Sequence, residues 1–277
     1  MNENKKIMQF LKKHKEGYGL KNIVALKEAG LKKSAFDILK LETGKVYAGN
    51  TKGVESAFVI LSGTCSISGE GFTFENIGSR KDVFSGKPTA VYLPCQTGYE
   101  VKAVTEVEIA VCSAESALKS KPVLIKPEDV KEVELGTLNW KRKAYFIIDQ
   151  GIDSQNLFLG ETHLSPGKWA FPPHRHDKDH LPEEVDMEEI YHFRVNPQTG
   201  FGIQLSYTDD RSRDDAYLVR NGDTVILPDG YHPACASPVD SLYILWFMAG
   251  DKRMFLSRPD DDYKWVTRCE SLLKSLK

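Results

Sequence analysis

The histidines of this chain are concentrated in its second half, where they could form a metal site. Of the seven histidines, six lie at or beyond position 163. His174 and His176 are two residues apart, so alternation along a strand would place both imidazoles on one face. Two neutral imidazoles on one face can bind a divalent metal ion when other strands supply a carboxylate and a third imidazole. The spacing therefore predicts a metal centre around these two residues.

A carboxylate and a third imidazole follow later in the chain. Glu189 begins a predicted strand, and the residues that share its face are apolar and expected to point inward: Tyr191, Phe193 and Val195. Glu183, Glu184 and Glu188 compete with Glu189 for the ligand position, and Glu188 lies on the opposite face of the strand. The predicted ligand set is His174, His176, Glu189 and His232.

The spacing of these residues resembles the two metal motifs of the cupin family. A glycine turn precedes His-x-His, a glutamate lies two residues before an aromatic residue, and Gly-x5-Pro-x-Gly-x-His closes the pattern. The sequence departs from the motifs in the single residue between Gly230 and His232 and in a longer insertion between His176 and Glu189. The matching residues are Gly167, His174, His176, Glu189, Gly222, Pro228, Gly230 and His232.

A closer resemblance covers most of the chain, from about Leu41 to Trp265. The second half is similar to the 5-deoxy-glucuronate isomerases of bacterial inositol catabolism, and Asp229 is a departure, since a basic residue is common there. The resemblance implies a metal-dependent aldose–ketose isomerase that converts 5-deoxy-D-glucuronate to 5-dehydro-2-deoxy-D-gluconate. The blocks that carry it are His174–Glu184, Tyr207–Ser212, Pro228–Pro233 and Met248–Arg253.

The predicted ligand set suits this reaction. Three imidazoles and one carboxylate fill four positions of a six-coordinate ion, and two neighbouring positions remain for the carbonyl and hydroxyl oxygens of an α-hydroxy aldehyde. Zinc, manganese or iron at such a site acts as a Lewis acid that stabilises an enediolate. Isomerisation also needs a base that carries a proton between carbons. The residues leave several candidates open: His180, Glu183, Glu184, Tyr207 and Tyr231.

The implied substrate is a small sugar acid, whose carboxylate calls for a cation in the pocket. Eight of the ten arginines lie at or beyond Arg175, and arginine pairs with carboxylates through two parallel hydrogen bonds. Arg211 and Arg253 are the first candidates for this substrate-binding role. The alternative is that they form salt bridges with nearby acids such as Asp209, Asp210 and Asp251.

Composition excludes several other classes of protein. The net charge of −2 gives no general attraction to nucleic acid, and no segment approaches the roughly 20 apolar residues of a membrane span. The first residues lack the apolar core of a signal peptide, so we expect a cytoplasmic protein. The five cysteines are odd in number and include no Cys-x-x-Cys, which argues against a disulfide framework.

Two series of short strands predict an all-β bicupin, that is, two cupin (jelly-roll) barrels. We expect residues 1–130 to form an N-terminal metal-free cupin domain and residues 140–277 to form the metal-binding one. Apolar residues at helical spacing predict short helices near residues 5–14 and over 264–277. We also expect the protein to form a homo-oligomer.

Three alternative functions remain open from the sequence. One is the related 5-keto-4-deoxyuronate isomerase of pectin breakdown. A second is an oxygenase, since the same ligands can bind Fe(II). A third is a non-enzymatic cupin that senses sugar acids, although the first 40 residues, which are basic, lack a clear helix-turn-helix.

Overall fold

The computed structural model describes residues 9–276 and is built almost entirely from β-strands. This confirms the predicted all-β class. The described residues form two compact units. The C-terminal unit contains the residues up to His14, Glu132–Tyr145 and the chain from Gly160 onward; the N-terminal unit contains Lys15–Lys131 and Phe146–Leu159. Each unit thus includes a segment from the other half of the sequence, and the ranges 1–130 and 140–277 stay a prediction of the functional domains.

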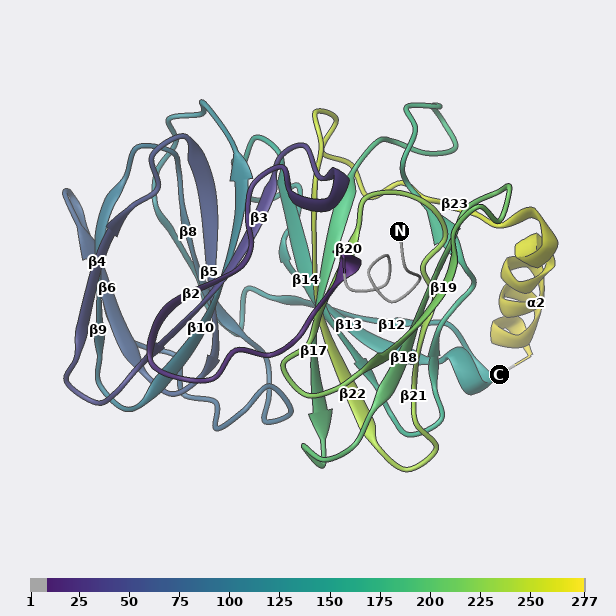
Figure 1. The fold of residues 1–277 in the computed structure, drawn as a ribbon, viewed down its shortest axis with the longest axis horizontal. Coiled ribbons are helices and arrows are strands. Elements are labelled where there is room, and N and C mark those ends of the chain that lie inside the picture. Colours follow the sequence, from purple (N-terminus) through teal and green to yellow (C-terminus); the bar gives the residue numbers. More distant parts are fainter. Residues whose placement is uncertain (1–8, 277) are drawn as a thin grey trace. The chain divides into compact units, whose positions relative to one another are not determined.

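The N-terminal unit consists of two antiparallel sheets, visible in purple and blue in Figure 1. The only helical turn between its strands in the described chain is the 3-10 turn η1 (Glu28–Gly30). In spatial order, the six-stranded sheet contains β11 (Val123–Ile125), β8 (Thr89–Leu93), β5 (Val54–Ser62), β10 (Val107–Glu115), β3 (Ser34–Leu41) and β2 (Gly19–Val24). The four-stranded sheet contains β4 (Val46–Asn50), β9 (Gly98–Ala103), β6 (Cys65–Gly69) and β7 (Phe72–Ile77).

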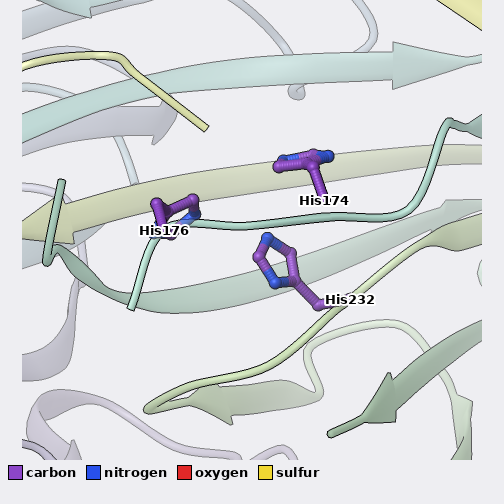
Figure 2. Close-up of side chains that lie close together, drawn as sticks. All are labelled: His174, His176 and His232. Atoms are coloured by element: carbon purple, nitrogen blue, oxygen red, sulfur yellow. The ribbon is translucent and has the colours of Figure 1, made fainter. Parts of the chain in front are cut away.

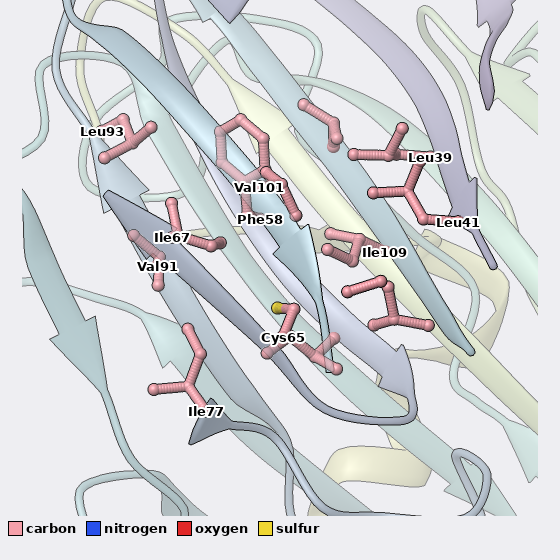
Figure 3. Packing of buried hydrophobic residues seen from close by; sticks show 14 residues of the cluster. Leu39, Leu41, Phe58, Cys65, Ile67, Ile77, Val91, Leu93, Val101 and Ile109 are labelled. Atoms are coloured by element: carbon pink, nitrogen blue, oxygen red, sulfur yellow. The ribbon is translucent and has the colours of Figure 1, made fainter. Parts of the chain in front are cut away.

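Alternating apolar residues of both sheets form the core of this unit (Figure 3). Phe58 and Ile60 on β5 share a face because side chains alternate along a strand, and both are buried. Val101 on β9 and Ile67 on β6 come from the other sheet and belong to the same cluster. The N-terminal unit therefore has the two-sheet core of a jelly-roll.

The C-terminal unit contains a seven-stranded, a four-stranded and a two-stranded sheet. The largest has the order β1 (Leu11–Lys12), β20 (Thr224–Leu227), β17 (Glu188–Asn196), β22 (Ser241–Ala249), β14 (Leu157–Leu164), β13 (Arg142–Ile148) and β12 (Lys131–Leu135). The four-stranded sheet contains β15 (Trp169–Ala170), β21 (Ala234–Ala236), β18 (Gly202–Tyr207) and β19 (Asp214–Val219). The smallest pairs β16 (His174–Arg175) with β23 (Arg258–Pro259).

Strand β17 lies inside the largest sheet and sets which side chains share a face. Glu189 is opposite Leu227 of β20 on one side and Met248 of β22 on the other. Tyr191 is opposite Val225 and Trp246 in the same registers, so it lies on the same face as Glu189. Both side chains are buried, as the alternation in the sequence predicted.

The two predicted terminal helices have different outcomes. The helix expected near residues 5–14 falls partly outside the described residues, which begin at Gln9. Gln9 and Phe10 are helical, but the helix does not continue through Leu11–Lys12, which form β1. Leu11 is buried where it pairs with Val225 of β20, so strand pairing overrides the helical spacing at this point. The C-terminal helix is confirmed as α2 (Lys264–Ser275), preceded by the 3-10 turn η3 (Asp261–Tyr263), while η2 (Leu138–Trp140) precedes β13. Among the described residues, no helix is both long and apolar enough to span a membrane.

Candidate metal centre

Three histidines from two separate segments meet in the C-terminal unit. His174 lies on β16 and His176 just beyond it, while His232 follows β20 (Figure 2). One ring nitrogen from each residue lies within 4.8 Å of the corresponding nitrogens of the other two. The rings of His174 and His232 are only 4.8 Å apart between centroids. The structure thus brings together the three imidazoles that the sequence predicted as ligands.

A backbone carbonyl holds the Nδ1 atom of each ring. His174 Nδ1 lies 3.1 Å from the carbonyl oxygen of Pro172, His176 Nδ1 lies 2.5 Å from that of Met187, and His232 Nδ1 lies 2.8 Å from that of Gly230. A carbonyl oxygen can only accept, so each Nδ1 must donate, and Nε2 of a neutral ring then carries the lone pair. This arrangement fixes ring orientation and tautomer as in the outer shell of metal sites.

Glu189 supplies a carboxylate to the same point. Its Oε2 lies 3.1 Å from Nε2 of His176 and 3.1 Å from Nε2 of His232. Two ligands about 2.1 Å from one ion and at right angles to each other are about 3.0 Å apart. Nε2 of His232 is buried and makes no hydrogen bond in the described chain. The donor atoms therefore fit a divalent ion.

Burial and charge keep Glu189 and His174 in the protonation states that a metal ligand needs. Burial, reinforced by the neighbouring imidazoles of His232 and His176, lowers the pKa of His174 to about 3. Burial would raise the pKa of Glu189, but the imidazoles of His176 and His232 lower it to about 2. Burial would likewise lower the pKa of His176, but hydrogen bonding to Glu189 raises it. At neutral pH the carboxylate is ionised and the His174 ring is neutral.

The acids that competed with Glu189 in the sequence are engaged elsewhere. Glu184 is buried and pairs with the guanidinium of Arg175, whose Nε lies 3.3 Å from Glu184 Oε2. Arg175 also pairs with Asp209. Glu183 is 52% exposed, with its carboxylate 3.8 Å from Nε of Arg258. Glu189 is therefore the acid that the described structure brings to the histidines.

Tyr207 and Tyr231 pack against each other beside this centre. The centroids of their rings are 5.2 Å apart, and their backbones form an antiparallel β-bridge. Tyr231 directly precedes His232 in the sequence. The Tyr207 hydroxyl donates to Asp260 Oδ2 at 2.7 Å, and the Tyr231 hydroxyl donates to Asp209 Oδ1 at 3.0 Å. Burial, together with these carboxylates, raises the pKa of both tyrosines above the usual range, so both keep their protons at neutral pH.

The other predicted catalytic residue lies on an exposed loop. The side chain of His180 is 65% exposed, and its Nδ1 is 3.7 Å from Glu183 Oε2. Its backbone is held by hydrogen bonds to Glu184 across a β-bridge. The structure does not gather His180 and Glu183 with the three central histidines.

The two predicted substrate-binding arginines lie in different surroundings. Arg211 is exposed, has a left-handed backbone (φ 57°), and its NH1 lies 3.4 Å from Asp214 Oδ1. Its guanidinium covers the Tyr207 ring at 3.9 Å from the centroid. This is the salt-bridge alternative that the sequence left open. Arg253 is half-buried in the segment after β22.

Sequence reasoning did not single out Arg142 or consider Tyr191 as more than a core residue. Tyr191 shares the buried face of Glu189, and its ring is 5.8 Å from that of His232. Arg142 begins β13, and its NH1 donates to the carbonyl oxygen of Phe171 at 3.0 Å. Arg142 lies far from the histidines in sequence, and only strand pairing brings it into the same sheet as Glu189.

Comparison with solved structures shows an architecture shared with cupin proteins. An IolB-like protein from Salmonella typhimurium LT2 superimposes with a TM-score of 0.89 at 30% identity, covering 93% of this chain and 99% of that one. The oxalate decarboxylase of Lactobacillus farciminis, solved as a formate complex, gives a TM-score of 0.65 at 10% identity over 96% of this chain and 92% of its own. At 10% identity, the second comparison shows a shared fold only, and it confirms the predicted bicupin architecture.

Comparison of sequences identifies the family. The 5-deoxy-glucuronate isomerase of Geobacillus kaustophilus is 39% identical over 83% of this chain and 84% of its own length. The protein of the same name from Bacillus subtilis (strain 168) is 36% identical over 83% of this chain and 86% of its own. The sequence model of the KduI/IolB family matches residues 10–266. The chain belongs to the KduI/IolB family.

Proposed function

We propose that this protein is a metal-dependent aldose–ketose isomerase that converts 5-deoxy-D-glucuronate to 5-dehydro-2-deoxy-D-gluconate. The relatives named 5-deoxy-glucuronate isomerase, 34–39% identical over most of the chain, support this assignment. The observation that carries it is a group of three buried or half-buried imidazoles, each with a ring nitrogen within 4.8 Å of the others, together with the buried Glu189 carboxylate, which lies 3.1 Å from two of them. Such a site suits a substrate that binds through two oxygen atoms.

We propose His174, His176, Glu189 and His232 as the ligands of one divalent ion, which zinc, manganese or iron could provide. Imidazole nitrogens and a carboxylate are acceptable to all three metals. When bound, the ion would polarise the carbonyl and hydroxyl oxygens of the substrate. The hydrogen bonds at Nδ1 of the three histidines would hold their Nε2 atoms in place during this step.

The reaction moves a proton from carbon 2 of the aldose to carbon 1, while the hydroxyl proton on O2 is transferred to O1. No atom or electron pair is gained or lost.

We propose Tyr207 as the first candidate for assisting this transfer, because it is buried beside the centre and its hydroxyl is already hydrogen-bonded to the carboxylate of Asp260. Tyr231 is a second donor in contact with Tyr207. His180 and Glu183 are exposed and would serve only from the 177–187 loop.

The test is turnover of 5-deoxy-glucuronate by purified protein loaded separately with zinc, manganese or iron. We expect turnover without oxygen, and incorporation of one solvent deuteron in deuterated water at the carbon that was carbon 1 of the aldose, which is carbon 6 of the product. Turnover that requires oxygen would indicate an oxygenase instead. Binding of sugar acids without turnover under any metal would support the sensing alternative. Parallel assays on 5-keto-4-deoxyuronate decide between the two isomerase substrates.

A further inference from the structure

Arg142 differs from Arg175, Arg211, Arg213 and Arg258, four other arginines of the C-terminal unit, in what it contacts. Its NH1 donates to two backbone carbonyl oxygens, those of Trp140 at 3.2 Å and Phe171 at 3.0 Å. The side chain is half-buried, and no described carboxylate forms a salt bridge with it. The acid that affects it electrostatically, Glu270, is itself bound by Lys274 at 2.5 Å and by Trp140.

Other arginines of this unit have carboxylate partners. Arg175 pairs with Glu184 and Asp209, and Arg213 pairs with Asp229. The remaining pairs of this kind are Arg211 with Asp214 and Arg258 with Asp261. These guanidinium groups each form an ion pair with a carboxylate, whereas the guanidinium of Arg142 forms hydrogen bonds only with neutral carbonyl oxygens.

The position of Arg142 relates it to the metal centre through the segment that carries His174. Phe171, whose carbonyl it binds, lies three residues before His174 on the segment that leads into β16. Arg142 also begins a strand of the sheet that contains Glu189 and Tyr191, and the Tyr191 ring is 5.8 Å from that of His232. The backbone that Arg142 binds at Phe171 therefore leads to the first predicted ligand.

A guanidinium in this environment is prepared to receive an anion. Partial burial removes water from the cation, and this burial lowers the pKa of Arg142. A carboxylate that reaches this guanidinium would pair with it through two parallel hydrogen bonds. The two hydrogen bonds from Nη1 to carbonyl oxygens would keep the guanidinium plane oriented before the anion binds.

We propose that Arg142 binds the carboxylate of the sugar-acid substrate, while the opposite end of the same molecule lies at the three histidines. This inference rests on the proposed isomerase function. It assigns to Arg142 the specificity of the enzyme for sugar acids over neutral sugars. It replaces Arg211 in that role, because Arg211 is exposed and paired with Asp214.

The variant Arg142→Lys tests the inference, since lysine keeps the charge but loses the fork. We expect kcat/KM for 5-deoxy-glucuronate to fall by about 10- to 100-fold, and kcat/KM for the neutral 5-deoxy-glucose to change by less than about 3-fold. Metal content should equal that of the unmodified protein. Arg220→Lys is a matched control, because Arg220 also donates to two carbonyl oxygens, those of Thr199 and Gly200, but is exposed. It should behave like the unmodified protein on both sugars.

Binding of glucuronate and glucose to the metal-loaded protein, followed by calorimetry, separates this inference from the proposed function. If glucuronate binds more tightly than glucose and Arg142→Lys or Arg142→Gln abolishes the difference, Arg142 is the carboxylate site even if 5-deoxy-glucuronate is not turned over. Equal loss for acid and neutral sugars, or an unchanged preference in both variants, would refute the assignment. Should neither variant fold, the absence of any preference for glucuronate in the unmodified protein would refute it equally.

Discussion

Nε2 of His176 and Oε2 of Glu189 lie 3.1 Å apart although thirteen positions separate the two residues in the sequence. His176 follows the short strand β16, whereas Glu189 belongs to β17 inside the largest sheet. The carbonyl oxygen of Met187 accepts a hydrogen bond from Nδ1 of His176, so the chain that leads into β17 also orients the histidine. The segment that leads into β17 therefore supplies both the Glu189 carboxylate and the Met187 carbonyl group that orients His176.

The first prediction concerns metal content. His176→Ala should reduce the affinity for a divalent ion by more than about 100-fold, since losing a direct ligand costs more than losing a residue that only orients one. Metal content after dialysis, measured by elemental analysis, checks this. His180→Ala is the control, because His180 is exposed, and it should retain its metal. Far-UV circular dichroism should show both variants folded; a metal content unchanged in His176→Ala would contradict the ligand assignment.

A second prediction compares the two tyrosines. Tyr207→Phe removes a hydroxyl that donates to the buried carboxylate of Asp260, so the free energy of unfolding should fall by about 1–3 kcal/mol. Tyr231→Phe removes a bond to Asp209, which is more than half exposed and can take water instead, so its loss should be smaller. Urea denaturation measures both. A larger loss for Tyr231→Phe would show that the Tyr207–Asp260 pair is not the tighter one.

The raised pKa of Tyr207 leads to a prediction at alkaline pH. Burial and the bond to Asp260 raise the folded-state pKa above the usual 10.0, so the neutral ring stabilises the folded protein fully below pH 10. That contribution is lost as the pH rises above 10 toward the folded pKa. The gap in unfolding free energy between the unmodified protein and Tyr207→Phe should therefore narrow above pH 10. A gap that stays constant between pH 8 and pH 11 would contradict this account.

The fourth prediction concerns Glu55 in the N-terminal unit. This fully buried carboxylate accepts hydrogen bonds from the backbone nitrogens of Gln155, Asn156 and Leu157 and from the Tyr92 hydroxyl, at 2.6–2.9 Å. Glu55→Ala should cost at least about 3 kcal/mol of unfolding free energy, because several buried donors lose their acceptor.

Chemical denaturation measures this loss, and the exposed Glu75 provides the control. Glu75→Ala should change the unfolding free energy by less than about 0.5 kcal/mol. Glu55→Gln should fall between the two, because an amide keeps one acceptor oxygen but presents N–H groups to the donors on its other side. Equal stability of Glu55→Ala and Glu75→Ala would show that this carboxylate does not anchor the 155–157 segment.

The sequence determined the fold class and the central residues of the site, because both depend on local patterns. Alternation placed Glu189 and Tyr191 on one buried face, and the spacing of His174 and His176 matches the adjacent imidazoles that the structure contains. Choosing Glu189 over Glu184 needed more than parity. That choice depended on the pairing of Glu184 with Arg175, a contact across a loop that periodicity does not encode.

Only the tertiary structure decided the surroundings of the histidines. Arg211 lies within the Tyr207–Ser212 block, yet it pairs with Asp214 at the surface. Arg142, ninety positions before His232, instead begins a strand in the same sheet as Glu189. Leu11 was expected in a helix and instead pairs with Val225. Long-range strand pairing determines these neighbours, and its free energy comes from buried contacts that form only when the whole sheet assembles.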